Sequence, residues 1–378
     1  MALKKKIAFV LILLCLTSLG TLQGVKSQSA ANIFINPDGS VSGTSLIQHR
    51  NNRYTLTGDI YDQTLVVECN NILVAGGGFT LQGAGGWGAP GVAGKESSAA
   101  INLTNNNVTI QNFKITGWEV GIYIPYNNNT IRSNFITETR SCIAIYADNI
   151  NVVGNYLANS IDGVLDKGNN DVFSKNWVLN DCEAFLLYYQ TSGHTITQNR
   201  MENNTEAINT FNGEGLEIYQ NNFINNQNNV EIISDAFSAP LGGGGGPLPP
   251  WDNGKEGNFW SNYTGEDVNG DGIGDTPYVV RSDICTVDRY PLVSPLNITE
   301  PSITTIVAGT SPSTEPSPTI NLSNSTATIQ LSISSSTANK NNQLAIILVI
   351  FAATLAAYLF VLIAVGTFGN KKFKQPKT

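Results

Sequence analysis

Residues 130–136 read Thr-Ile-Arg-Ser-Asn-Phe-Ile, and similar phrases built around an asparagine return at an almost constant interval along the chain. The asparagines are separated by 22, 21, 21, 23 and 22 residues; they are Asn112, Asn134, Asn155, Asn176, Asn199 and Asn221. A period in the twenties is typical of stacked supersecondary units, each of which buries its apolar side against its neighbours. This repeat therefore determines the fold class.

Each repeat contains two or three short β-strand patterns, as in residues 108–110, 112–115 and 121–124. These runs are rich in β-branched and aromatic residues and are separated by asparagine, glycine and serine, and no apolar stripe of helical period persists. We predict an all-β fold, a right-handed parallel β-helix with one coil of 21–23 residues per repeat. Stacking then places the asparagines in a ladder, at turns where asparagine tolerates the left-handed backbone bend.

Both ends of the chain carry targeting patterns. Residues 1–28 contain three lysines, an uncharged run and then small and polar residues, which is typical of a signal peptide. Residues 344–368 lack charged side chains and are long enough to cross a membrane, and the lysine-rich tail 369–378 predicts a cytoplasmic C-terminus. We expect a single-pass protein of the cell membrane whose ectodomain is extracellular.

Between these ends, residues 29–295 are expected to form the β-helix ectodomain, with a closing segment at 251–295. Residues 296–343 are rich in Ser, Thr and Pro and cannot bury enough apolar surface to fold, so they predict a stalk. Asn-X-Ser/Thr sequons in the stalk and the ectodomain predict a glycoprotein.

The charge of the ectodomain excludes one class of partner. The net charge of the whole chain is −8, but eight of the 21 basic residues lie at the two ends, which leaves 13 basic against 29 acidic residues outside the cell. An acidic ectodomain argues against nucleic acid and suits cation binding. Export permits disulfides between Cys69, Cys142, Cys182 and Cys285, with connectivity left open. Cys142 and Cys182 lie almost two repeats apart, about 10 Å, which is too far for a bridge.

The closing segment carries the most specific resemblance. Gly257-Asn-Phe-Trp-Ser-Asn-Tyr263, Gly270-Asp-Gly-Ile-Gly-Asp275 and Asp288-Arg-Tyr-Pro-Leu292 resemble the C-terminal signature of NosD-like β-helix proteins. This family is also described as carbohydrate-binding and sugar-hydrolysis (CASH) repeat domains and is common among archaeal surface proteins. The resemblance covers roughly residues 32–295 and implies an exported parallel β-helix. It implies little about activity.

The family is named for a copper-site maturation factor, and this sequence departs from that role. Copper sites use His, Cys or Met ligands. The mature chain has only His49, His194 and Met201 beside its four cysteines, and these are not clustered in the sequence. We therefore expect no copper.

An aspartate-rich loop is the strongest signal for a metal. Asp267, Asn269, Asp271 and Asp275 place oxygen side chains at alternate positions, with glycine after the third, and the Ile273 carbonyl can serve as a further ligand. This spacing predicts Ca²⁺ binding by a loop of a class other than the EF-hand, because Tyr278 stands where an EF-hand has glutamate. The alternative is a turn that needs no metal.

Aromatic side chains follow four of the asparagines: Phe113, Phe135, Tyr156 and Trp177. If the next residues point inward, alternation turns these rings outward as a possible platform for sugar rings. Lys114 breaks the pattern in the first coil, so the opposite register stays open. Packing between coils is the interpretation that we favour.

Catalysis needs converging acids, and only one compact acidic cluster is present. Asp162, Asp166 and Glu183 are candidates for a polysaccharide hydrolase, lyase or epimerase, with Asp181 nearby. The hypothesis that we favour is a non-catalytic surface β-helix that binds extracellular polysaccharide or envelope and surface proteins. The enzyme hypothesis requires these carboxylates to meet in one cleft.

Overall fold

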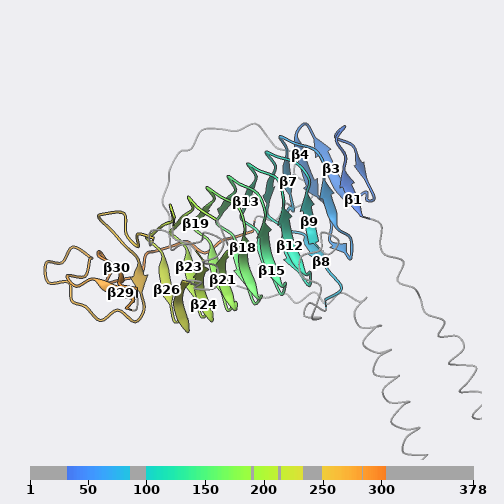
Figure 1. Cartoon of the computed structure of the whole chain (residues 1–378). Coiled ribbons are helices and arrows are strands. Elements are labelled where there is room, and N and C mark those ends of the chain that lie inside the picture. Colours follow the sequence, from blue (N-terminus) through green and yellow to red (C-terminus); the bar gives the residue numbers. More distant parts are fainter. Residues whose placement is uncertain are drawn as a thin grey trace, which may run out of the picture. The chain divides into compact units, whose positions relative to one another are not determined.

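The computed structural model describes residues 32–85, 99–188, 191–211, 214–232, 249–282 and 284–303. These residues form a β-solenoid in which each regular coil contributes one strand to each of three sheets, and the coils follow one another along the stack (Figure 1). Pairing between coils is parallel, and no helix occurs in this part of the chain. The predicted all-β parallel solenoid is confirmed.

Sheet A has ten strands, and most of those in the regular coils are five residues long; they are β1 (Ile33–Ile35), β2 (Val41–Ser42), β6 (Leu65–Val67), β9 (Ala99–Leu103), β12 (Val120–Ile124), β15 (Ser141–Ile145), β18 (Asp162–Asp166), β21 (Glu183–Leu187), β24 (Glu206–Thr210) and β27 (Asn228–Ile232). Sheet B has nine, mostly of three residues: β3 (Ile47–Arg50), β4 (Arg53–Leu56), β7 (Leu73–Ala75), β10 (Thr109–Gln111), β13 (Thr130–Arg132), β16 (Asn151–Val153), β19 (Val172–Ser174), β22 (Thr195–Thr197) and β25 (Glu217–Tyr219). Sheet C has nine: β5 (Ile60–Tyr61), β8 (Thr80–Gln82), β11 (Lys114–Thr116), β14 (Phe135–Thr137), β17 (Tyr156–Ala158), β20 (Trp177–Leu179), β23 (Arg200–Glu202), β26 (Asn222–Ile224) and β28 (Phe259–Trp260).

The core is a set of columns of apolar side chains that point into the solenoid. The central residue of each short strand is buried, because successive side chains of a strand alternate between the two faces. In sheet C this inward column is Ile136, Leu157, Val178 and Met201, all fully buried. Each coil therefore depends on its neighbours for burial, as the period of the repeat predicted.

The asparagine ladder lies inside the corner between sheets B and C. Each carboxamide oxygen accepts hydrogen bonds from the coil before it: Asn176 Oδ1 accepts from the main-chain N–H of Asn155 at 2.9 Å and from its Nδ2 at 3.0 Å. Asn176 Nδ2 donates in turn to the Val152 carbonyl at 2.9 Å. The members that show this pattern are Asn134, Asn155, Asn176, Asn199, Asn221 and Asn258.

Asn112 is not a member of the ladder, which corrects the register of the first coil. Lys114 pairs with Phe135, so Phe113 takes the ladder position and Asn112 lies one residue earlier with a φ of 57°. That earlier position is left-handed in the following coils as well: Ser133, Gly154, Lys175, Gln198 and Gln220. The left-handed bend thus belongs to the residue before each ladder asparagine, and Asn112 suits it because asparagine tolerates positive φ.

The closing segment covers the end of the core beyond β26. Trp260 is fully buried and stacks on Phe223 at 4.2 Å and on Tyr278 at 4.4 Å between ring centroids. Its Nε1 donates to Asp288 Oδ2 at 2.9 Å, and the same oxygen accepts the Asn258 amide at 2.7 Å. A two-stranded antiparallel sheet, β29 (Tyr278–Arg281) with β30 (Thr286–Asp288), completes the segment.

Several expectations concern residues outside this description. The signal peptide 1–28, most of the stalk, the span 344–368 and the tail 369–378 all lie there. Within the described residues, no helix is long and apolar enough to span a membrane. The four cysteines outside the signal region are unpaired in the structure; Cys142 is buried and Cys182 is exposed.

Candidate functional site

Acidic side chains line the outer face of sheet A. The first residues of neighbouring strands are in register and place Asp162 beside Glu183 and Glu183 beside Glu206. We call these three residues the acidic column. Ser141 Oγ donates to Asp162 Oδ2 at 2.6 Å, and Asn209 Nδ2 donates to Glu206 at 2.8 Å and to Glu183 at 3.3 Å. Partial burial, followed by repulsion from Asp162 and Glu206, raises the pKa of Glu183 to about 7.

Two tyrosines and a lysine form a second column just beyond the C-terminal ends of these strands. Lys167 Nζ lies 4.7 Å from the ring centroid of Tyr146 and 4.4 Å from that of Tyr188, so the ammonium is held between two aromatic rings. Tyr123 and Phe211 extend this tyrosine–lysine stack by ring contacts at each end, at 5.3 and 5.7 Å. Tyr146 and Lys167 are exposed to solvent.

A hollow of about 180 Å³ lies beside the tyrosine–lysine stack. Its lining combines small apolar side chains with tyrosines and two cations: Val120, Tyr123, Arg140, Ser141, Ala144, Tyr146, Leu165, Lys167 and Tyr188. Arg140 also pairs with Glu119 at 3.5 Å. The outer face of sheet A therefore offers aromatic rings with two cations in one column and carboxylates in another.

The structure separates the three catalytic candidates. Asp162 and Glu183 come together on the outer face, whereas Asp166 is fully buried inside the solenoid. The strand pairing of sheet A skips Gly163, which interrupts the regular alternation of side chains in β18. Asp162 and Asp166 therefore lie on opposite sides of the sheet, although they are four residues apart. Asp181 is also buried, at the corner between sheets C and A, where its Oδ1 accepts the Ser160 amide. The acids that are close in the sequence thus lie in three different places.

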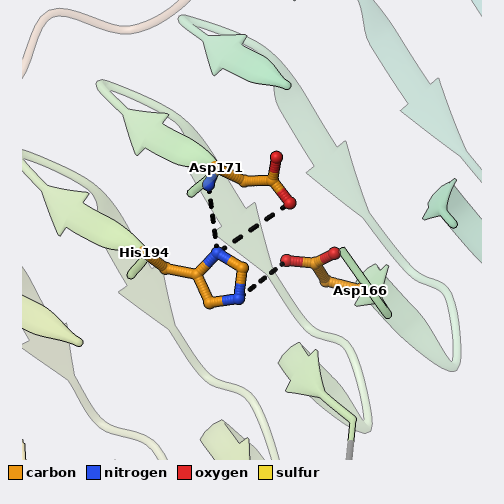
Figure 2. Close-up of side chains that lie close together, drawn as sticks. All are labelled: Asp166, Asp171 and His194. Carbon is orange, nitrogen blue, oxygen red and sulfur yellow. Dashed lines mark hydrogen bonds and ion pairs between the residues drawn. The ribbon is translucent and has the colours of Figure 1, made fainter. Parts of the chain in front are cut away.

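Asp166 belongs to a second cluster, together with Asp171 and His194 (Figure 2). Asp166 ends β18, Asp171 precedes β19, and His194 precedes β22 one coil later. Asp166 Oδ2 lies 3.5 Å from His194 Nε2, and Asp171 Oδ2 lies 3.8 Å from His194 Nδ1. All three side chains are fully buried, and one ligand atom from each lies within 4.8 Å of the others. We call these residues the buried triad.

The corner between sheets A and B explains why Asp171 and His194 meet. A polar side chain here accepts the main-chain amide of the coil before, as Asn129 Oδ1 accepts from Val108 at 2.8 Å. Asp171 Oδ1 accepts from Ile150 at 2.6 Å in the same way, and His194 Nδ1 accepts from Asp171 at 3.2 Å. Aspartate and histidine thus occupy places that any acceptor of suitable size can fill.

Burial controls the charges of the buried triad. It raises the pKa of both Asp166 and Asp171, and the Asp166 carboxylate raises that of Asp171 further. Burial also lowers the pKa of His194 to about 4, so the imidazole is neutral near pH 7. Asp166 Oδ2, Asp171 Oδ2 and His194 Nε2 have no hydrogen-bond partner. Donor atoms of this kind, an imidazole nitrogen and carboxylate oxygens, are ligands for Cu²⁺ and for related divalent transition metals.

The predicted calcium loop lies in the closing segment, far along the chain from the buried triad. Asp267 accepts main-chain amides from Gly270 and Gly272, both at 2.8 Å, and Asp275 Oδ2 accepts from Val268 at 2.7 Å. Asn269 and Asp271 also accept amides within the loop. The Gly274 amide bonds to the carbonyl of Pro291, outside the loop. Calcium binding at this loop stays a prediction.

The aromatic strip beside the ladder is placed on sheet C. Phe135 and Tyr156 face outward and stack at 4.9 Å, whereas Phe113 is fully buried because of the corrected register. Trp177 Nε1 donates to the carbonyl of Ile298 at 3.3 Å, so the chain that follows the closing segment returns over this strip. Packing within the protein, the favoured interpretation, therefore accounts for the contacts of Trp177.

Comparison with known proteins agrees with the resemblance noted in the sequence. Residues 58–265 match the family described as "Periplasmic copper-binding protein (NosD)". The chain belongs to this family. A NosD relative from Stutzerimonas stutzeri, named "Probable ABC transporter binding protein NosD", is 32% identical over 123 residues, which are 31% of this chain and 25% of that protein. The chain thus matches only about a quarter of the length of that relative.

The NosD match corrects the expectation that no copper is involved, because the family is described as copper-binding and periplasmic. The expectation rested on the absence of clustered histidine and methionine in the sequence. Clustering along the sequence is not a valid criterion in a solenoid, because the coils bring His194 next to Asp166 and Asp171, which precede it by 28 and 23 residues. Calcium, the other expected cofactor, finds no support in the family description.

The tyrosine–lysine stack and Glu206 were not predicted from the sequence. A signal was present: Tyr146, Lys167, Tyr188 and Phe211 recur at 21, 21 and 23 residues, the period of the repeat itself. Asp171 and His194 follow the same interval of 23 residues. Columns of unlike residues are harder to recognise than a column of asparagines.

Proposed function

We propose that this chain is an exported, membrane-anchored β-solenoid that binds an extended glycan along the outer face of sheet A. The observation that carries the proposal is the tyrosine–lysine stack, which runs beside the acidic column along the axis of the solenoid. Export through the signal peptide 1–28 and anchoring by residues 344–368 place this face in the cell envelope. The NosD family is described as periplasmic, which is compatible with an exported protein.

The chemistry of the two columns suits sugars. The apolar edges and hydroxyl groups of the tyrosines can contact sugar rings, and carboxylates accept hydrogen bonds from sugar hydroxyl groups. Neighbouring coils are about 4.8 Å apart, comparable with the length of one sugar unit, so a linear polymer can place successive sugars on successive coils. Lys167 and Arg140 in the hollow supply charges that would attract the carboxylates of an acidic polysaccharide.

Binding can be tested with the purified full-length protein and a panel of immobilised acidic and neutral polysaccharides. Tyr146→Ala and Tyr188→Ala should each weaken retention about tenfold, which corresponds to about 1.4 kcal/mol. Tyr61→Ala is the matched control, because Tyr61 is a tyrosine on sheet C that is 59% exposed and lies outside the hollow. Absence of any retained polysaccharide, or an equal loss with Tyr61→Ala, would refute the proposal.

The same experiment separates binding from catalysis. A glutamate whose pKa is about 7, beside the second carboxylate of Asp162, has the protonation required of a general acid. Retention without release of products supports the binding function. Release of shortened or unsaturated sugars that disappears in Glu183→Gln and Asp162→Asn would instead make the protein a polysaccharide-degrading enzyme.

Copper binding is a second candidate function, favoured by the unpartnered donors of the buried triad and by the description of the NosD family. The residues fit Cu²⁺ better than Cu⁺, because the triad supplies nitrogen and oxygen and no sulfur. The three side chains would hold the ion inside the solenoid, where a bound metal links two consecutive coils. Copper analysis of protein recovered from the cell envelope tests this function; copper-free protein after growth in copper-supplemented medium would refute it.

A further inference from the structure

We infer that Asp166, Asp171 and His194 form an internal site for one divalent transition-metal ion, bound through Asp166 Oδ2, Asp171 Oδ2 and the His194 imidazole. The inference deepens the copper function proposed above by naming the ligands and the charge of the ion. It does not require copper itself to be the ion that the cell supplies.

The unpartnered atoms carry the inference. Buried polar atoms in native proteins almost always have a hydrogen-bond partner. With both carboxylates ionised, three buried atoms of this cluster lack one, Asp166 Oδ2, Asp171 Oδ2 and His194 Nε2, and each comes from a different residue of the triad. A proton shared between the two carboxyl groups would instead join Asp166 to Asp171. The side chains are fully buried, and one possible ligand atom from each residue lies within 4.8 Å of the others. An ion bound between Asp166 Oδ2 and His194 Nε2, which lie 3.5 Å apart, would satisfy all three if Asp171 Oδ2, now 3.8 Å from His194 Nδ1, turned toward it.

In each carboxylate, one oxygen accepts a main-chain hydrogen bond and the other lies near His194. Asp166 Oδ1 accepts the Gly168 amide at 2.8 Å, and Asp171 Oδ1 accepts the Ile150 amide at 2.6 Å. These hydrogen bonds fix both side chains and leave each Oδ2 directed toward His194, as Figure 2 shows. The two carboxylates are therefore held in place by main-chain contacts that do not depend on the ion.

Charge balance favours a divalent ion. Two carboxylates in a dry interior need a compensating positive charge, and the cation nearest in sequence, Lys167, is on the outer face between Tyr146 and Tyr188. Two carboxylates and a neutral imidazole balance a charge of about +2, whereas Cu⁺ would leave an uncompensated negative charge. Protons shared among the three side chains are the competing way to satisfy them.

The donor set also selects among divalent ions. Imidazole suits Cu²⁺ and Zn²⁺, and the Irving–Williams order makes Cu²⁺ the tighter of the two, whereas Ca²⁺ and Mg²⁺ prefer sites made only of oxygen. Binding through Nε2 places the ring proton on Nδ1, which now accepts the Asp171 amide at 3.2 Å. Loading therefore changes the tautomer of His194 and removes that hydrogen bond, which gives the site a spectroscopic signature.

The experiment compares refolding with and without metal, because the site is closed to solvent. Full-length protein is refolded in metal-free buffer with Cu²⁺, Zn²⁺ or Ca²⁺, desalted, and measured for metal content and melting temperature. We expect about one equivalent of Cu²⁺ or Zn²⁺, no retained Ca²⁺ at this site, and an electron paramagnetic resonance spectrum of the Cu²⁺ form with coupling to one imidazole nitrogen.

Variants locate the ion. Asp166→Asn and Asp171→Asn retain the oxygen that accepts the Gly168 or Ile150 amide, so they should fold and bind metal at least about tenfold more weakly. His194→Gln tests the imidazole by loss of the nitrogen coupling. The matched control is Asp181→Asn: Asp181 is equally buried, also has an unpartnered Oδ2, and lies at a different corner, so its replacement should leave metal content unchanged.

The outcomes separate this inference from the copper function. Folded wild-type protein that retains neither Cu²⁺ nor Zn²⁺ overturns the inference and leaves proton sharing as the explanation. Copper retained equally by Asp166→Asn, Asp171→Asn and His194→Gln also overturns it, although the copper function would survive at another site. Zn²⁺ bound by the triad without Cu²⁺ would support the inference and contradict the copper function.

Discussion

The asparagine ladder allows the effect of one substitution on stability to be worked from the structure. Asn176→Ala removes a fully buried carboxamide that accepts the Asn155 main-chain amide and donates to the Val152 carbonyl. Each buried group left without a partner costs about 1–3 kcal/mol, so the two together should lower the free energy of unfolding by about 4 kcal/mol. For a domain of this size that corresponds to a melting temperature lower by roughly 10 °C.

The assay is urea unfolding of the full-length protein, followed by circular dichroism and by tryptophan fluorescence. The two signals are compared because a stack of repeats need not unfold in a single step. Asn106→Ala is the control, since Asn106 is exposed in a turn, and it should change stability by no more than about 0.5 kcal/mol. If Asn176→Ala is no more destabilising than Asn106→Ala, the ladder does not stabilise the stack and the reasoning fails.

Three further predictions concern the face, the packing and the end of the solenoid. The pKa of Glu183 is raised to about 7, so the folded protein keeps a proton that the unfolded chain loses near pH 4.5, and the melting temperature should fall as pH rises from about 4.5 to about 7. The melting temperature of Glu183→Gln should fall less over this range. An equal fall in the wild type and in Glu183→Gln would contradict the prediction. Gly163→Ala should lower the free energy of unfolding in urea by about 1–3 kcal/mol, because the added Cβ would lie 2.4 Å from Val178 Cγ1 and 2.7 Å from the Ala184 carbonyl oxygen. An unchanged urea midpoint would show that the coils are not packed this closely at Gly163. Trp260→Ala should cost about 3–5 kcal/mol by opening the end of the core, while Val268→Ala, at a residue 81% exposed, should be silent; equal urea midpoints for the two variants would show that Trp260 does not close the core.

The repeat predicted the solenoid because its physical cause is local: every coil needs the same inward residues at the same interval. The exact register of the first coil was not predictable, since Asn112-Phe113 has the same letters as Asn134-Phe135 but lies one position earlier in the coil. Asparagine is favoured at two adjacent positions for different reasons, positive φ at one and ladder hydrogen bonds at the next. The member that continues the ladder, Asn258, follows an insertion, so no constant interval pointed to it.

The candidate sites were less predictable than the fold, because closeness in sequence misleads in a coil. Asp162 and Asp166 are four residues apart in one strand, yet Asp162 bonds to Ser141 and lies beside Glu183 on the outer side of sheet A, whereas Asp166 lies inside next to His194. Glu206 and Asp162 are 44 residues apart, yet they share one column of the outer face. A search that aligns each coil on its ladder residue, before asking which acids are neighbours, would have found both the acidic column and the buried triad.

The corners of the solenoid explain how reactive side chains can enter its interior without disturbing the stack. A polar side chain at a corner accepts the main-chain amide of the preceding coil, as Asn129, Asp171 and His194 all do. Exchange among these residue types keeps the inter-coil hydrogen bond while changing charge and ligand chemistry. The outer face of sheet A is free of that requirement, so it can present residues selected by an extended ligand. A solenoid of this kind therefore has two faces on which the proposed functions can develop, an internal one for a small ion and an external one for a polymer, and the two meet where Asp166 is followed by Lys167.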